Sequence, residues 1–305
     1  MKALLSKRLV LITGKGGVGR SSVTAALAAV AQRHGKRVLV AETSDGGEDY
    51  SALAQLFGHT QLPRNVAEIA PGIRGTQLLT SVGVEQYLTS VLRIPALART
   101  AASSEPIRRL LSAGPSFREM GMFFHLLTCL EEKLPNGKPA NELVIVDMPA
   151  TGHTLALMSL PETLLRLVSR GPVAETLRKG QAYLRDATLS GAYIVTLPEI
   201  LPISEALELI DGLKNSASIV SGVLVNRVPK EIFSPEERAA LTPYLREHSV
   251  YGAESFASIL SAQRMVERLQ QNTVVPHLTL PTFDKHGTEL VEQLSLALDG
   301  QEFAR

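Results

Sequence analysis

A glycine-rich stretch near the amino terminus constrains the fold of this chain more than any other feature. It reads GKGGVGRSS over residues 14–22, after an apolar run at residues 9–13 and before an Ala-rich segment at residues 21–34. Glycines let the backbone turn tightly with its N–H groups pointing inward. The apolar run is typical of a buried strand, and the Ala-rich segment of a helix. The stretch therefore predicts a strand, a tight loop and a helix in direct succession.

Short runs rich in Val, Ile and Leu recur along the chain and are typical of strands buried on both faces of a sheet. These runs lie at residues 9–13, 37–42, 143–148, 192–197, 219–228 and 273–275. Segments with helical character alternate with them, at residues 21–34, 203–214 and 254–271. The alternation predicts an α/β fold with a mainly parallel sheet flanked by helices and right-handed crossovers.

The spacing of the predicted strands breaks once. About a hundred residues separate the strand at residues 37–42 from the strand at residues 143–148, far more than one crossover needs. Helical patterns fill much of this interval, at residues 83–92, 106–112 and 116–134. We therefore expect residues 1–305 to form a single domain with an inserted helical subdomain over approximately residues 80–140.

Composition limits the partners that the chain can bind. With 31 basic and 30 acidic side chains, the formal charge of +1 gives no overall attraction to nucleic acid or to anionic membranes. The single cysteine, Cys129, rules out an intrachain disulfide and a multi-cysteine metal site, and it suits a reducing compartment. No window approaches the ~20 apolar residues that span a bilayer. We expect a cytoplasmic protein without stable membrane insertion or nucleic-acid binding.

The glycine-rich stretch also fits a phosphate-binding loop. Backbone N–H groups of such a loop surround phosphate oxygens, and the following helix adds the positive end of its dipole. Ser21 stands where a hydroxyl would bind Mg²⁺. The buried strand at residues 143–147 ends in Asp147, a carboxylate suited to orienting Mg²⁺ through water. The pattern departs at Arg20, where this kind of loop has Lys.

GKGGVGRSS, together with DMPATGHTLALMSLP at residues 147–161, resembles the ArsA-type branch of the deviant Walker A P-loop ATPases. That family includes the arsenite-pump ATPase and the ATPase that targets tail-anchored proteins. The resemblance continues through VTLPEILPISEALELI, VLVNRV and VVPHLTLP at residues 195–210, 223–228 and 274–281. It therefore spans most of the chain and implies a P-loop NTPase fold that binds ATP and Mg²⁺.

The resemblance implies roles for the matching residues. Lys15 matches the signature lysine, which reaches the partner subunit's nucleotide in a closed dimer. Asp45 matches the carboxylate that polarises the attacking water, so Lys15 and Asp45 are the expected catalytic residues. Ser21, Asp45 and Asp147 are the residues expected near Mg²⁺. The implied nucleotide-binding residues are Gly14, Lys15, Gly16, Gly17, Val18, Gly19, Arg20, Ser21, Ser22, Glu199, Asn226, Pro276, Pro281 and Phe283.

Several of these positions have alternative interpretations. Asn226 is expected to read adenine, because an amide can both donate to and accept from the edge of that base, but it could simply end a strand. Asp45 could belong to an exposed acidic turn, and Glu199 could be a loop carboxylate. His153, within the TGHT motif, could be a capping or core histidine.

Arg20 divides the functional prediction. Arginine keeps the positive charge of lysine, but its guanidinium is planar and its side chain is longer. At a tightly enclosed phosphate site the exchange of lysine for arginine is therefore not conservative. We expect a dimeric ATP-binding protein that hydrolyses Mg–ATP, slowly because of Arg20, and drives conformational switching for an unidentified client. The alternative is a non-hydrolysing, nucleotide-gated regulatory or scaffold subunit. The dimer could be a homodimer, or a heterodimer with a second ArsA-like chain that receives Lys15.

The predicted helix at residues 116–134 is apolar on two sides, which is more than one buried stripe requires. It could line a groove for a protein client, or it could be buried between the sheet and a dimer partner. Arsenite and interfacial zinc both need several cysteines, which this chain lacks. A membrane-positioning role like that of MinD is disfavoured, because the segment at residues 287–305 is mostly acidic.

Overall fold

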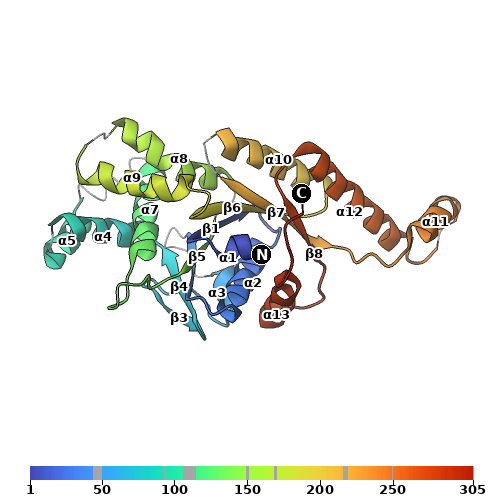
Figure 1. The fold of residues 1–305 in the computed structure, drawn as a ribbon, viewed down its shortest axis with the longest axis horizontal. Coiled ribbons are helices and arrows are strands. Elements are labelled where there is room, and N and C mark those ends of the chain that lie inside the picture. The colour runs from blue at the N-terminus through green and yellow to red at the C-terminus, as the bar shows by residue number, and fades with distance from the viewer. Residues whose placement is uncertain are drawn as a thin grey trace.

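One mixed sheet forms the centre of the protein (Figure 1). The computed structural model describes residues 1–43, 50–92, 94–105, 115–148, 151–167, 170–215, 219–248 and 250–304. In these residues eight strands hydrogen-bond in the order β3-β4-β2-β5-β1-β6-β7-β8. The strands are β1 Leu9–Gly14, β2 Val38–Thr43, β3 Ala67–Ala70, β4 Ile73–Leu78, β5 Leu143–Asp147, β6 Ser190–Thr196, β7 Val220–Val228 and β8 His277–Pro281. Only the β3–β4 pair is antiparallel, which confirms the mainly parallel α/β fold.

Helices cover both faces of this sheet (Figure 1). Their bounds are α1 Lys2–Leu5, α2 Arg20–Arg33, α3 Ala52–Gln55, α4 Thr80–Leu92, α5 Pro95–Ala102, α7 Pro115–Glu131, α8 Thr151–Leu167, α9 Pro172–Arg185, α10 Ile200–Asn215, α11 Pro235–Glu247, α12 Ala253–Asn272 and α13 Gly287–Leu298. Side chains of α1, α2, α3 and α13 fill one core cluster, and those of α7, α8, α9, α10 and α12 fill the other.

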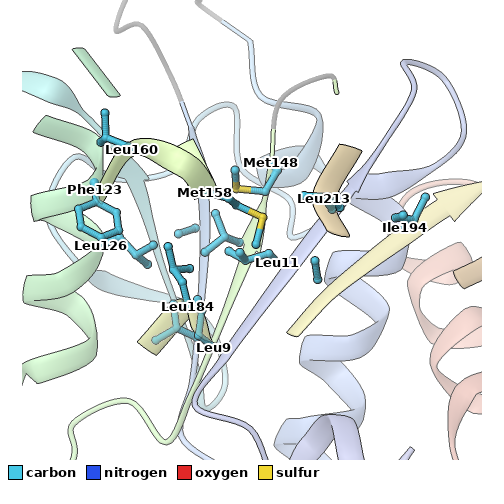
Figure 2. Close-up of a cluster of buried hydrophobic side chains, with 14 of the residues drawn as sticks. Leu9, Leu11, Phe123, Leu126, Met148, Met158, Leu160, Leu184, Ile194 and Leu213 are labelled. Carbon is cyan, nitrogen blue, oxygen red and sulfur yellow. The ribbon is translucent and has the colours of Figure 1, made fainter. Parts of the chain in front are cut away.

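Strand β1 shows why a continuous apolar run forms such a strand. Successive side chains of a strand point to opposite faces of the sheet. Leu9 and Leu11 enter the cluster with α7 to α10, which Figure 2 shows, whereas Val10 and Ile12 enter the cluster with α2 and α13. Every residue of β1 is buried, so no polar position interrupts the sequence pattern.

The structure corrects the predicted strands in two places. Strands β3 and β4 join the sheet within the interval for which only helices were predicted. The strand predicted at residues 273–275 is wrong: the last strand is β8, which begins at His277. Val274 is 89% exposed, and the Thr273 hydroxyl oxygen accepts a hydrogen bond from the backbone of Val275 at 3.1 Å, which forms a turn between α12 and β8.

The helices α4, α5 and α7 lie in the region predicted to be an insertion. Gly83 of α4 and Gly121 of α7 allow these helices to cross closely, because a Cβ added at Gly83 would lie 1.8 Å from the Gly121 carbonyl oxygen. Helix α9, which follows β5, packs on the same group through Gly180 against the Phe123 ring. The helix predicted at residues 106–112 lies outside the described residues, and a separate subdomain over residues 80–140 stays a prediction.

Helix α7 buries its apolar side chains inside this chain. Figure 2 shows Phe123 and Leu126 of α7 in the core with Leu160 of α8 and Leu184 of α9. The buried residues of α7 also include Phe124, Leu127 and Leu130. The helix at residues 116–134 was interpreted either as the lining of a client groove or as buried between the sheet and a dimer partner. The described side chains favour burial, and the helices that cover them belong to the same chain.

Replacing Phe123 tests this packing. We expect Phe123→Ala to lower the free energy of unfolding by about 3–5 kcal/mol, because the ring is 1% exposed and the neighbouring helices cannot fill its volume. Urea denaturation followed by circular dichroism measures the loss. Thr128→Ala, at an exposed position of the same helix, is the control. A cost below about 1 kcal/mol for Phe123→Ala would contradict the packing described.

Candidate functional site

The glycine-rich loop links β1 to α2 as the sequence predicts. Gly14 has a φ of 147° and Gly19 a φ of 92°, a range in which side chains are strained. A Cβ at Gly14 would lie 2.2 Å from the carbonyl oxygen of Val195 in β6, and one at Gly19 would lie 2.4 Å from Asn226 Nδ2 in β7. Only glycine therefore fits at these two positions. Gly16 has open space beside it, and Gly17 has both open space and a positive φ of 82°.

The loop lies at the carboxyl edge of the parallel strands, where the strand order reverses around β1. Strand β1 pairs with β5 on one side and β6 on the other. Open α/β sheets bind ligands in the crevice at such a switch point. Asp147 ends β5 and Pro281 ends β8, so the same edge collects residues that are far apart in sequence.

Ser21 and Asp147 meet at the head of α2. The Ser21 hydroxyl donates a hydrogen bond to Asp147 Oδ2 at 2.5 Å, and Oδ1 of the same carboxylate is buried with no hydrogen-bond partner among the residues that the structure describes. Burial raises the pKa of Asp147, while the Ser21 hydrogen bond and the charge of Arg20 oppose the rise. A hydroxyl and a carboxylate are the hard oxygen ligands that Mg²⁺ prefers, and the unpartnered oxygen would be satisfied by a cation or its water. The pair therefore fits a Mg²⁺ site.

No group of three or more His, Cys, Asp or Glu side chains in the described ranges could hold a metal ion. A cation at Ser21 and Asp147 would complete its coordination with water or with oxygens of a bound phosphate. The lone Cys129 is buried, and burial raises the pKa of its thiol to about 12, which suits core packing.

Arg20 contacts the backbone that follows β5. Its Nη1 donates a hydrogen bond to the Met148 carbonyl oxygen. The guanidinium thus lies beside the Asp147 carboxylate, which explains its effect on the pKa of that group. A guanidinium has five donors in a fixed plane and an ammonium has three, so Arg20 retains further donors beside the one that Met148 accepts. Arg20 joins the glycine loop to the start of the segment between β5 and α8.

Lys15 is held by its own chain. Its side chain is 53% exposed, and its Nζ forms an ion pair with Glu205 of α10. The predicted contact of Lys15 with a partner subunit stays a prediction. To make that contact, the ammonium would have to leave Glu205.

A second group of predicted residues gathers at the ends of β7 and β8. Ser22, Asn226, Pro281 and Phe283 line a pocket of about 190 Å³. Asn226 is buried, and its Nδ2 donates a hydrogen bond to the Val18 carbonyl oxygen at 2.9 Å. The amide therefore connects the pocket directly to the glycine loop.

Other predicted residues lie apart from these groups or are not described. Glu199 is exposed in the turn before α10, next to the same edge of the sheet. Pro276 precedes β8, at the opposite end of that strand from Pro281, so the structure does not bring it to the pocket. Asp45 lies outside the described residues, and so does the side chain of His153.

Sequence reasoning missed two residues near the site. Glu205 carries no local signal, because it sits within an amphipathic helix like any surface acid. Arg227 has a φ of 55°, and no other non-glycine residue described here has a positive φ. A left-handed backbone costs a residue other than glycine about 1–2 kcal/mol. The sequence pointed to the preceding Asn226, but the backbone angle of Arg227 depends on the fold.

The fold and the loop define a nucleotide-binding α/β protein of the P-loop class. Residues 7–172 match the family model described as anion-transporting ATPase, the ArsA ATPase family. The chain belongs to this ATPase family, which confirms the resemblance inferred from its motifs. No helix within the described ranges is long and apolar enough to cross a membrane.

Several individual proteins are similar to this chain. ATPase BagA of Mycobacterium tuberculosis is 28% identical over 237 residues, which cover 76% of this chain and 68% of that protein. The arsenical pump-driving ATPase of Escherichia coli is 25% identical over 324 residues, covering 88% and 52%. ATPase ASNA1 homolog 1 of Paramecium tetraurelia is 24% identical over 159 residues, covering 51% and 44%.

The raised pKa of Asp147 yields a prediction about stability. The folded chain binds this proton more tightly than the unfolded chain, so the stabilisation is complete below the ordinary carboxyl pKa and is lost as pH rises through the raised value. We expect Asp147→Asn, without nucleotide, to unfold at a higher temperature than the parent at pH 7, since it removes a buried charge.

Differential scanning fluorimetry between pH 4 and pH 8 measures this difference. Asp186→Asn is the control, because the Thr188 hydrogen bonds lower the pKa of that exposed carboxylate and its removal brings no gain. Asp147→Asn should also lose the stabilisation that Mg–ATP gives the parent. A ligand-free variant that melts below the parent at pH 7 would contradict a net cost of burying the Asp147 charge.

Proposed function

We propose that this chain is a Mg²⁺-dependent ATPase that works as a dimer and couples nucleotide turnover to conformational switching. The observation that carries the proposal is the Ser21–Asp147 pair at the head of α2, with its unpartnered buried oxygen, directly beside the glycine loop. Family membership supports the ATPase activity. Hydrolysis by this particular chain, its dimerisation and its protein client are parts of the proposal.

In this proposal the loop amides and the first turn of α2 bind the β- and γ-phosphates. Arg20 keeps one N–H on the Met148 carbonyl and directs other donors to phosphate oxygens. Ser21 and Asp147 hold Mg²⁺, which when bound neutralises charge that develops on the phosphates. Asp45 orients the water that attacks the γ-phosphate in line with the leaving oxygen.

The remaining residues serve binding and assembly. Asn226, Pro281 and Phe283 enclose the adenine ring, and Glu199 lies near the edge of their pocket. Pro276 has no part in binding the ring, because it lies at the other end of β8. Lys15 exchanges Glu205 for phosphate oxygens of the nucleotide in the partner subunit. That partner is a second copy or a related ArsA-like chain. A protein client would bind the helices α4 and α5, where Ile94 and Leu97 are at least half exposed.

A second candidate function is a nucleotide-gated subunit that binds ATP without hydrolysing it. The Arg20–Met148 contact favours it, because a guanidinium held by a backbone carbonyl has less freedom to follow charge in the transition state. One misplaced donor can slow such a reaction by about 10²–10³-fold.

Turnover distinguishes these functions. We expect the purified chain to release phosphate from Mg–ATP and Asp45→Asn to lower kcat by about 100-fold or more, because an amide is a poor acceptor for the proton of water. ATP affinity should change less than about threefold. A coupled phosphate-release assay and calorimetry provide the two values.

Asp49→Asn, four residues further along the sequence and without a family role, is the control for this experiment. Tight ATP binding by the parent without any phosphate release would favour the non-hydrolysing subunit. Equal rates for the parent and Asp45→Asn would remove Asp45 from the mechanism.

The dimer is tested through Lys15. We expect light scattering to give twice the monomer mass with a non-hydrolysable ATP analogue, and Lys15→Ala to stay monomeric, because it lacks the cation that crosses to the partner. Lys2→Ala is the control, because it removes one positive charge at a position away from the loop. A nucleotide-bound Lys15→Ala dimer as stable as the parent's would exclude this role.

A further inference from the structure

Arg227 stands at the pocket formed by the ends of β7 and β8, yet its side chain is not used by the fold. It is exposed and lines the pocket together with Phe283. Its guanidinium has no hydrogen bond or ion pair to the parts of the chain that the structure describes. The pairing of β7 with β8 shifts register between Val225 and Val228, which is where Arg227 projects.

The backbone at Arg227 is held in an unfavourable conformation. Its φ of 55° suits glycine or asparagine better than arginine. Asn226, its neighbour, is fixed to the glycine loop by the hydrogen bond to Val18. Strained backbone of this kind persists where the surrounding structure imposes it and where function uses the side chain. Because Arg227 lines the pocket, a ligand bound there would meet its guanidinium.

The dimensions and lining of the pocket indicate which part of a ligand it takes. Its volume of about 190 Å³ is below the about 300–1,000 Å³ of sites that enclose a whole drug-sized molecule, so it suits one ring system. Lys285 also lines the pocket but is paired with Glu289 at 3.0 Å. The planar groups of the lining are the rings of Phe283 and His286 and the guanidinium of Arg227, and such groups bind flat heteroaromatic rings by their faces.

We propose that Arg227 is a specificity-determining residue that stacks its guanidinium on the base of the bound nucleotide and favours a purine over a smaller pyrimidine. This role rests on the proposed function, because the base must reach this pocket when the triphosphate occupies the glycine loop. Asn226 reads the edge of the base, and Arg227 adds contact with its face. The left-handed backbone aims the side chain at the pocket.

Calorimetry on the full chain with Mg²⁺ tests this role with three probes: ATP, CTP and inorganic tripolyphosphate. We expect Arg227→Ala to weaken ATP binding about fivefold and CTP binding less, and to leave tripolyphosphate binding unchanged. Arg227→Lys should not restore ATP affinity to the parent value, because an ammonium lacks the planar face. Lys230→Ala, an exposed cation three residues away that does not line the pocket, should bind all probes like the parent.

Arg227→Gly tests whether a loss of ATP affinity comes from misfolding. Glycine adopts a φ of 55° without strain, so this variant should melt no lower than the parent while losing ATP affinity like Arg227→Ala. A lower melting temperature for Arg227→Gly would overturn the strain argument.

Any one of three binding results would overturn the role of Arg227 and leave the proposed function intact. These are an ATP affinity of Arg227→Ala equal to the parent's, full rescue by Arg227→Lys, or an equal loss of affinity for tripolyphosphate. A parent chain that binds neither ATP nor tripolyphosphate would overturn the proposed function as well.

Discussion

The close passage of the glycine loop between neighbouring strands is the constraint on which the site depends. Gly14 lies against the Val195 carbonyl of β6, and Gly19 lies against the Asn226 amide of β7. Any side chain at either position would push the loop away from the sheet edge. Since the Val18 carbonyl is also bound by Asn226, the loop, the head of α2 and the pocket beyond β7 form one connected unit. Movement of any one part would displace the others.

The charged groups of this unit are each held by a different element. Arg20 is bound to the backbone after β5, Ser21 to the Asp147 carboxylate, and Lys15 to Glu205 of α10. In the proposed function Arg20 keeps its bond to Met148 and offers its other donors to the triphosphate, whereas Lys15 exchanges Glu205 for the nucleotide of the partner subunit. Because Glu205 belongs to α10, loss of its contact with Lys15 gives a physical route from ligand binding to helix movement.

The strands that the sequence predicted are those whose neighbours bury both faces with apolar side chains, as in β1 and β5. Strand β4 was missed because it carries Arg74, Thr76 and Gln77. Tertiary contacts satisfy these polar groups: Arg74 reaches Asn141 at 2.9 Å and Glu132 at 3.0 Å. Such partners are distant in sequence, so a hydropathy pattern indicates a loop or a helix where the structure has a buried strand.

The sequence by itself determined the α/β class, the glycine loop and the family, because these depend on local spacing and on motifs read along the chain. It also named Ser21 and Asp147, with Asp45, as the residues near Mg²⁺. Tertiary structure decided the rest: the burial that leaves Asp147 Oδ1 unpartnered, the ion pair of Lys15 with Glu205, and the left-handed backbone of Arg227. Each of these depends on which distant segments pack together, and packing between residues more than a hundred positions apart has no local signal.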